Sequence, residues 1–177
     1  MAKLLYAAAM SLDGFIAGHG GDMHWLTDHL GPNPLADELV DGVGALLVGA
    51  NTFRGDDPNK GTDSEGAFGG RWHGPQFVLT HRPPDEPVPD TTFLDDLDAA
   101  VTAAKAAAGG KYVNVLGANV AKQCLEAGVL DEILVFVVPV LLGDGVRVFW
   151  HPGGTDVRLD RIRLVDTANA LWFRVAR

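Results

Sequence analysis

Two segments of the chain pass from a run of apolar, strand-forming residues through a glycine directly into a helical pattern. Residues 46–53 (LLVGANTF) turn at Gly49, and residues 113–121 (VNVLGANVA) turn at Gly117. A strand that enters a helix in this way leaves backbone N–H groups of the first helical turn unpaired, and these groups together with the helix dipole attract anions such as phosphate. Two such turns predict a ligand with more than one phosphate group, such as a dinucleotide. Each glycine taken alone is equally consistent with a simple tight turn.

Strand patterns alternate with helix patterns over the first two-thirds of the chain. The predicted strands cover residues 3–10, 45–48, 76–80 and 111–116, followed by a long apolar strand from Ile133. The predicted helices run from Asn33 or Pro34 to about Val40, from Asp95 or Asp96 to the glycine pair 109–110, and over 118–127. Residues 157–166 and 171–176 alternate apolar and polar side chains, which predicts an antiparallel hairpin joined across residues 167–170.

This order of elements predicts an α/β fold with residues 1–177 in a single domain. We expect a three-layer sandwich, in which a mostly parallel central sheet is extended by antiparallel C-terminal strands. Pro139 falls in the strand from Ile133, and since proline donates no backbone hydrogen bond we expect a bulge or an edge position there.

Two glycine-rich segments show no periodicity. Residues 15–32 are rich in Gly, His and Asp and are predicted to form an ordered loop. Residues 54–74 are polar, which in so long a segment is typical of either disorder or a functional lid. Phe68 and Trp72 favour a lid that closes over a flat ligand.

Charge and composition restrict the partners. The chain has 14 basic and 23 acidic residues, a net charge of −9 that repels nucleic acid and anionic membranes, so neither is an expected partner. No apolar run is long enough to span a bilayer, and we expect a cytoplasmic protein. The lone Cys124 is interpreted as a core residue. The long apolar strand from Ile133, with Trp172 and Phe173 near the C-terminus, predicts a homodimer that uses the C-terminal strands.

Three segments are expected to meet beyond the carboxyl ends of the parallel strands, where open α/β sheets bind ligands. They are residues 49–52, 80–82 and 117–120. Thr52 and Thr80 contribute hydroxyl groups, and Arg82 contributes a guanidinium group suited to phosphate. The sequence contains neither a Gly-x-Gly-x-x-Gly fingerprint nor a Gly-Lys-Ser/Thr phosphate loop.

A cluster of potential metal ligands lies in the first glycine-rich segment, at His19, Asp22, His24, Asp28 and His29. Gly20 and Gly21 break any helix that would place two histidines on one face, and the spacing fits no common metal template. We therefore predict no metal site and interpret these side chains as solvated loop residues.

Four motifs occur in a defined order along the chain. They are residues 11–17 (SLDGFIA), residues 46–49 (LLVG) with Thr52 and Phe53, residues 78–82 (VLTHR), and residues 128–133 (GVLDEI) continuing to 139–143 (PVLLG). From about Lys3 to Phe149 the chain resembles the dihydrofolate reductase-like family. It is similar, more narrowly, to the reductase domain of bifunctional riboflavin-biosynthesis deaminase-reductases.

The resemblance implies a dihydrofolate reductase-like fold, NADPH as the hydride donor, and a homodimer. By position in the motifs, it places Ile16 and Ala17 at the nicotinamide, and Gly49, Asn51 and Thr52 at a phosphate. It places Thr80, His81 and Arg82 on the adenosine side, and Gly117, Ala118, Asn119 and Val120 at the pyrophosphate.

The chain departs from the family pattern at three points. Ala50 stands where the family usually has an arginine, and Ala118 where it usually has a second glycine. The carboxylate that binds the pterin in dihydrofolate reductases has no assigned counterpart, although Asp37 and Glu38 lie on the appropriate predicted helix. These departures place folate in doubt as the substrate.

The main hypothesis is an NADPH-dependent reductase that acts on a small heterocyclic (pterin- or pyrimidine-like) or carbonyl-type substrate. Asp13 is the candidate catalytic residue, for substrate binding or proton relay, with a simple turn role as the alternative. Trp25 is the candidate to cover a flat substrate ring. Gly117→Val is expected to fold but to bind the cofactor weakly. The competing hypothesis is a non-catalytic nucleotide- or ligand-binding protein that kept the fold, which Ala50 and the unassigned carboxylate support.

Overall fold

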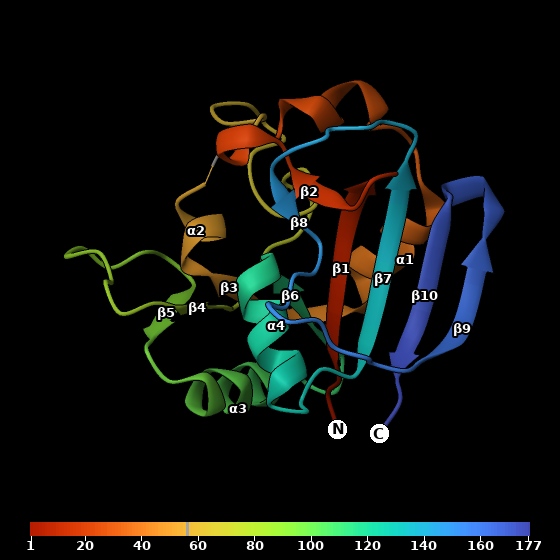
Figure 1. Cartoon of the computed structure of the whole chain (residues 1–177). Coiled ribbons are helices and arrows are strands. Elements are labelled where there is room, and N and C mark those ends of the chain that lie inside the picture. Colours follow the sequence, from red (N-terminus) through yellow and green to blue (C-terminus); the bar gives the residue numbers. More distant parts are fainter. Residues whose placement is uncertain (56) are drawn as a thin grey trace.

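The computed structural model describes residues 1–55 and 57–177, and an eight-stranded sheet forms its centre (Figure 1). The strand order is β5-β4-β3-β6-β1-β7-β10-β9. The parallel strands are β1 (Leu4–Ser11), β3 (Val43–Gly49), β4 (Gln76–Leu79), β5 (Thr91–Leu94), β6 (Tyr112–Leu116) and β7 (Glu132–Val138). The strands β9 (Leu159–Val165) and β10 (Ala170–Val175) form an antiparallel hairpin, and β10 pairs antiparallel with β7. The predicted mostly parallel sheet with an antiparallel C-terminal hairpin is confirmed.

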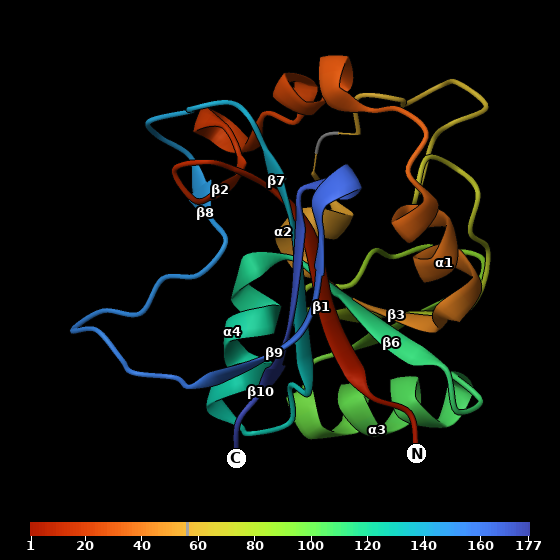
Figure 2. The same cartoon turned by 90° about the vertical axis from the view of Figure 1, so that its right-hand side faces the viewer.

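Helices cover both faces of the sheet, as the predicted three layers require (Figure 2). Helix α1 (Pro34–Gly42) packs on one face, and helices α3 (Leu97–Ala107) and α4 (Ala118–Glu126) pack on the other. The single-turn helix α2 (Ala50–Phe53) directly follows β3. Within the part of the chain that the structure describes, no helix is long and apolar enough to cross a membrane.

Side-chain caps begin two of these helices at the predicted positions. The Asn33 side chain accepts hydrogen bonds from the N–H groups of Leu35 and Ala36 at the start of α1. Asp96 accepts one from the N–H of Ala99 at the start of α3. Each cap satisfies backbone donors that the helix itself leaves unpaired.

The hydrophobic core has one part on each face because side chains alternate along the strands. Leu4 and Tyr6 of β1 pack with α3 and α4, whereas Leu5 packs with α1. All three are buried, and complete burial of a leucine contributes about 1.5–3 kcal/mol. The strand β1 lies between β6 and β7, with Leu5 opposite Asn114 and Glu132.

A buried carboxylate joins several elements at the amino end of the sheet. Glu132 is 2% exposed and accepts hydrogen bonds from Lys3 Nζ at 2.8 Å, Tyr112 OH at 3.0 Å and Trp172 Nε1 at 2.8 Å. Burial, followed by the hydrogen bond to Glu132, raises the pKa of Tyr112 to about 12. Trp172, predicted to contribute to an apolar surface, is therefore a core side chain.

Several short elements differ from the predictions. Residues 15–32, predicted as a loop, contain the strand β2 (Phe15–Ala17) and two 3-10 helices, His19–Gly21 and His24–His29. Strand β2 pairs antiparallel with β8 (Val146–Arg147) in a separate two-stranded sheet. The edge strand β5 was also not predicted. These strands are two to four residues long, too short for a periodic pattern.

The expectation for Pro139 was wrong. Strand β7 ends at Val138, and it lies between β1 and β10 in the interior of the sheet. Because proline cannot donate to a neighbouring strand, Pro139 lies just beyond the strand and produces neither a bulge nor an edge.

Candidate functional site

A long groove runs across the carboxyl ends of the parallel strands. Segments that follow β1, β3, β4, β6 and β7 all contribute to its lining, as do residues of the 19–31 segment and of α1. The lining includes every residue predicted to bind the cofactor: Ile16, Ala17, Gly49, Asn51, Thr52, Thr80, His81, Arg82, Gly117, Ala118, Asn119 and Val120. The structure thus brings these separate segments to one surface, and their binding roles stay predictions.

The two glycine turns lie close to each other, and both line the groove. Gly117 has a φ of +107°, and a Cβ atom added to it would lie 2.5 Å from Thr52 Oγ1 and 3.8 Å from the Gly49 nitrogen. Only glycine adopts such a backbone without strain. The geometry counts against the expectation that Gly117→Val leaves folding broadly intact, because a branched side chain would meet both a positive φ and the Thr52 hydroxyl group.

Helix α4 begins at this contact, and residues of its first turn line the groove. Its N-cap is Gly117, and no side chain caps the helix. Ala118, Asn119 and Val120 follow and line the groove. An uncapped helix N-terminus next to a close backbone approach suits an anionic group such as a pyrophosphate.

The segments that follow β3 and β4 contain two arginines, Arg54 directly after α2 and Arg82 shortly after β4. Nη2 of Arg54 donates to Thr80 Oγ1 at 3.3 Å and to the carbonyl oxygen of Arg82. Thr80 Oγ1 also accepts from the backbone N–H of Arg82 at 3.1 Å. Arg54 therefore lies beside Arg82, the cation predicted for the adenosine side, and both line the groove.

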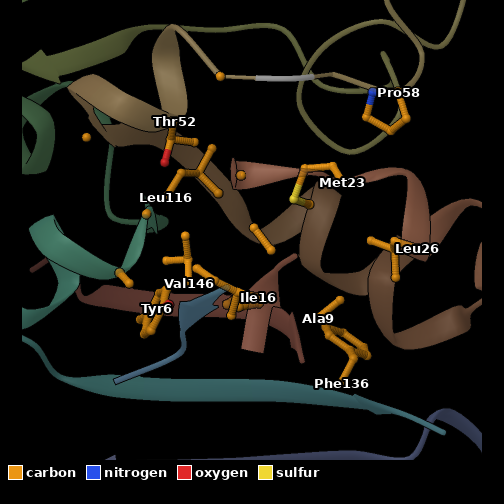
Figure 3. Close-up of a pocket in the computed structure, with 18 of the residues that line it drawn as sticks. Tyr6, Ala9, Ile16, Met23, Leu26, Thr52, Pro58, Leu116, Phe136 and Val146 are labelled. Carbon is orange, nitrogen blue, oxygen red and sulfur yellow. The ribbon is translucent and has the colours of Figure 1, made fainter. Parts of the chain in front are cut away.

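The other end of the groove is mainly apolar. Figure 3 shows Ile16 of β2, Ala9 of β1 and Phe136 of β7 around the cavity, together with Met23 and Leu26. Apolar linings with few polar groups are typical of sites for small organic ligands. This end lies at the residues predicted for the nicotinamide, Ile16 and Ala17.

Asp13, the predicted catalytic residue, is not among the groove-lining residues. Its Oδ1 accepts hydrogen bonds from Ser11 Oγ at 2.6 Å and from the Leu142 N–H at 3.1 Å, and its Oδ2 accepts from the Gly143 N–H at 2.7 Å. The hydrogen bond from Ser11 is the main cause that lowers the pKa of Asp13 to about 2. The carboxylate holds the segment after β7 next to the end of β1, so the geometry favours the structural alternative.

Trp25 is likewise not part of the groove lining. Its ring is partly buried, and Nε1 is buried without a hydrogen-bond partner in the described part of the chain. The geometry therefore gives no support to direct contact between Trp25 and a substrate. The prediction for Trp25 rested only on its aromatic ring and its position in a loop near the first strand.

The aromatic residues of the 54–74 segment belong to the core. Trp72 is 9% exposed, and its Nε1 donates to the Val43 carbonyl oxygen at 3.1 Å. Phe68 packs against the same core cluster and also lines the groove. The interpretation of Trp72 as a lid residue was wrong, because it fixes the segment to the end of α1. Asp56, within this segment, lies outside the described residues.

Two groove residues received no role from the sequence. Asp37 on α1 and Arg71 of the 54–74 segment both line the groove, and Asp37 Oδ1 accepts a hydrogen bond from Arg71 Nη1. The sequence offered Asp37 only through its helix position, and nothing in it links Asp37 to a residue 34 positions away. Across residues 1–55 and 57–177, no group of three or more His, Cys, Asp or Glu side chains is placed to hold a metal ion.

Comparison with known proteins identifies relatives at the level of family and fold. The sequence model described as the RibD C-terminal domain matches residues 2–171. Curated protein sequences give no significant match.

Solved structures with similar folds include three informative ones. A protein of Shewanella sp. PV-4 assigned to riboflavin biosynthesis has a TM-score of 0.72 and 23% identity, with 100% of both chains covered. A diaminohydroxyphosphoribosylaminopyrimidine deaminase/5-amino-6-(5-phosphoribosylamino)uracil reductase of Thermotoga maritima has a TM-score of 0.65 and 19% identity over 98% of this chain, but over only 56% of its own. Dihydrofolate reductase of Enterococcus faecalis, complexed with NADP(H), has a TM-score of 0.61 and 18% identity over 99% of this chain and 97% of its own. These likenesses establish the dihydrofolate reductase-like fold.

Proposed function

The chain belongs to the RibD C-terminal domain family, a family of reductases, and we propose that it transfers hydride from NADPH to a small, pyrimidine-like heterocycle. The observation that carries this proposal is the contact between Gly117, Thr52 and Gly49 at the uncapped start of α4. It creates a place where phosphate oxygens approach backbone N–H groups closely. An apolar cavity follows at one end of the groove, and two arginines lie at the other.

The residues present fit NADPH along the whole groove. Residues 117–120 would hold the pyrophosphate, and Ile16 and Ala17 would contact the nicotinamide. Bound NADPH supplies the hydride, so the protein has to align the two rings and exclude water. Ala9, Ile16 and Phe136 give this end the apolar lining that such exclusion needs.

The proton that completes a reduction does not come from Asp13 in this proposal. With a pKa of about 2 this carboxyl group is ionised at neutral pH. Its oxygens hold the N–H groups of Leu142 and Gly143, which keeps the segment after β7 in place beside the groove. Asp13 is therefore a positioning residue for this part of the site.

Selectivity for NADPH over NADH requires a group that binds the 2′-phosphate. Arg82 is the predicted residue, and Arg54, whose guanidinium donates to the backbone carbonyl oxygen of Arg82, is a second candidate that lines the groove. A planar guanidinium matches phosphate oxygens through paired N–H donors. Because Arg54 binds the Arg82 backbone carbonyl, it also holds the end of β4 against the start of the 54–74 segment.

We also propose that the protein is a homodimer through its C-terminal hairpin. Strand β9 is an edge strand, and Leu159, Ile162 and Leu164 on it are 39%, 43% and 53% exposed. Exposed apolar side chains on an unpaired edge favour association with a second copy. Trp172 is buried and takes no part in this surface.

The test of the proposed function is binding followed by turnover. Melting temperature measured against NADPH concentration should rise, since a ligand at a hundredfold excess over its Kd adds about 2.7 kcal/mol to the free energy of unfolding. A melting temperature that stays constant up to millimolar NADPH would refute the proposal. The loss of NADPH absorbance with uracil- and pterin-type substrates then separates an enzyme from the non-catalytic binding protein.

A further inference from the structure

The end of the groove predicted for the adenosine contains a carboxylate beside its arginines. Asp95 directly follows β5 and lines the groove together with Thr80 and Arg82. The Thr80 N–H donates to the Leu94 carbonyl oxygen at 2.7 Å, which places Asp95 next to Thr80 at the end of the parallel β4–β5 pair. Because Thr80 Oγ1 accepts from the Arg82 N–H at 3.1 Å, Asp95 and Arg82 border the same part of the groove.

The basic side chains of this part of the groove leave Asp95 unneutralised. Across residues 1–55 and 57–177, the exposed Asp95 carboxylate forms no ion pair and accepts no hydrogen bond. Nη2 of Arg54 is already used by Thr80 Oγ1 and the Arg82 carbonyl oxygen. Ala50 stands where the family usually has an arginine, so that cation is missing. The guanidinium of Arg82 is therefore the main positive charge left for a 2′-phosphate.

The positive end of α3 is occupied as well. This helix begins two residues after Asp95, and Leu97 in its first turn lines the groove. Oδ1 of the N-cap Asp96 accepts from the Ala99 N–H at 2.8 Å, and Asp98 also lies in the first turn. These two carboxylates satisfy the helix dipole that would otherwise attract a phosphate group. The start of α3 therefore adds negative charge next to Asp95.

A carboxylate at this position distinguishes the two nicotinamide dinucleotides by their ribose. The 2′- and 3′-hydroxyl groups of NADH donate hydrogen bonds, which a carboxylate accepts. NADPH carries a phosphate on the 2′ oxygen, so that donor is lost and two negative charges face each other. The Arg82 guanidinium attracts the same phosphate. Asp95 and Arg82 thus act in opposite directions on the choice of cofactor.

We infer, on the basis of the dinucleotide-dependent reductase proposed above, that Asp95 is a specificity-determining residue that lets NADH compete with NADPH. Asp95 accepts hydrogen bonds from the ribose hydroxyl groups of NADH and repels the 2′-phosphate of NADPH. Arg82 offsets this repulsion without overcoming it by a wide margin. The proposed reduction therefore takes its hydride from either dinucleotide.

The experiment is a calorimetric titration of NADPH and NADH into the wild type, Asp95→Asn and Asp98→Asn. The wild type should prefer NADPH by no more than about tenfold in Kd. Asp95→Asn keeps a hydrogen-bonding side chain but removes the charge, and should shift the ratio of the two Kd values towards NADPH by about tenfold. Asp98→Asn is the matched control, since it makes the same charge change outside the described groove lining, and it should keep the wild-type ratio.

Two fragments locate the effect at the adenosine end. Adenosine 2′,5′-bisphosphate and 5′-AMP differ only in the 2′-phosphate and contain no nicotinamide. Asp95→Asn should shift the ratio of their Kd values in the same direction as for the whole dinucleotides. Thermal unfolding without ligand should be the same for the wild type and Asp95→Asn, because the Asp95 side chain is exposed and has no partner among the described residues.

A wild type that prefers NADPH by more than about tenfold would overturn the inference. An Asp95→Asn variant whose ratio shifts no further than that of Asp98→Asn would overturn it as well. In both cases NADPH still binds, so the proposed function stands. If neither dinucleotide binds to the wild type, the proposed function is refuted, and the inference about Asp95 falls with it.

Discussion

Replacement of Gly117 by alanine should destabilise the protein through two separate effects. The backbone at φ +107° is strained for any residue with a Cβ atom, at a cost of about 1–3 kcal/mol. The added Cβ would also lie 2.5 Å from Thr52 Oγ1, and overpacking of this kind costs about 1–3 kcal/mol more unless the hydroxyl rotates away. Urea unfolding monitored by circular dichroism gives the combined loss in the free energy of unfolding.

Two further variants separate these effects. Gly110→Ala introduces a methyl group at φ +88°, where nothing lies within 4 Å, and so measures the backbone cost alone. Thr52→Ala in the Gly117→Ala background removes the close oxygen and should recover the steric part, which appears as a coupling energy in a double-mutant cycle. The reasoning is refuted if Gly117→Ala costs no more than Gly110→Ala and shows no coupling to position 52.

Four other measurements test separate parts of the structure. The free energy of unfolding should fall as pH rises from 10 towards 12, because the folded protein holds the Tyr112 proton more tightly than the unfolded chain does. Tyr112→Phe should reduce this fall without removing it, since burial also raises the pKa of Tyr6 and of Cys124. Asn114→Leu should stabilise the protein by about 1 kcal/mol in urea unfolding, since its buried Oδ1 has no partner among the described residues; a loss of stability would contradict this. Light scattering should give twice the chain mass of 18.8 kDa, and Ile162→Lys should give the monomer, whereas a monomeric wild type would reject the proposed dimer. Arg82→Ala should weaken NADPH binding by about 1.5–3 kcal/mol and leave NADH binding nearly unchanged. Equal losses of affinity for NADPH and NADH would mean that another residue determines the selectivity, and Arg54→Gln would then be titrated with both cofactors.

The helices and turns that could be predicted from the sequence are those whose capping residues, apolar positions and glycines lie within one short segment. Helix α3 has a capping aspartate, an apolar face and a terminal glycine pair within one short segment, so its limits follow from the residues themselves. The same holds for the glycine turns at Gly49 and Gly117, which lie together in the groove as predicted. Strands β2 and β8 could not be predicted, because they depend on pairing between Phe15 and Arg147, more than a hundred positions apart.

The side-chain roles were less predictable than the elements for a related reason. An aspartate after a strand looks the same in the sequence whether it binds a ligand or holds a distant loop, and Asp13 binds the backbone of residues 142–143. Trp72 stands in a polar, glycine-rich segment, which conceals the fact that its ring is buried. The pair of Asp37 and Arg71 depends on the path of that same segment, which no periodic pattern specifies.

The central position of β1 has a consequence for how the chain is made. This strand leaves the ribosome well before its partners in the sheet, β6 and β7, which end at Leu116 and Val138. Its apolar residues therefore have no strand partner until synthesis has passed Leu116 for β6 and Val138 for β7. Pairing between strands so distant in sequence is slow to form and leaves hydrophobic surface exposed meanwhile. Nascent β1 is thus a segment that a chaperone would bind during synthesis, and from which aggregation would begin if the chain were released before β6 and β7 were made.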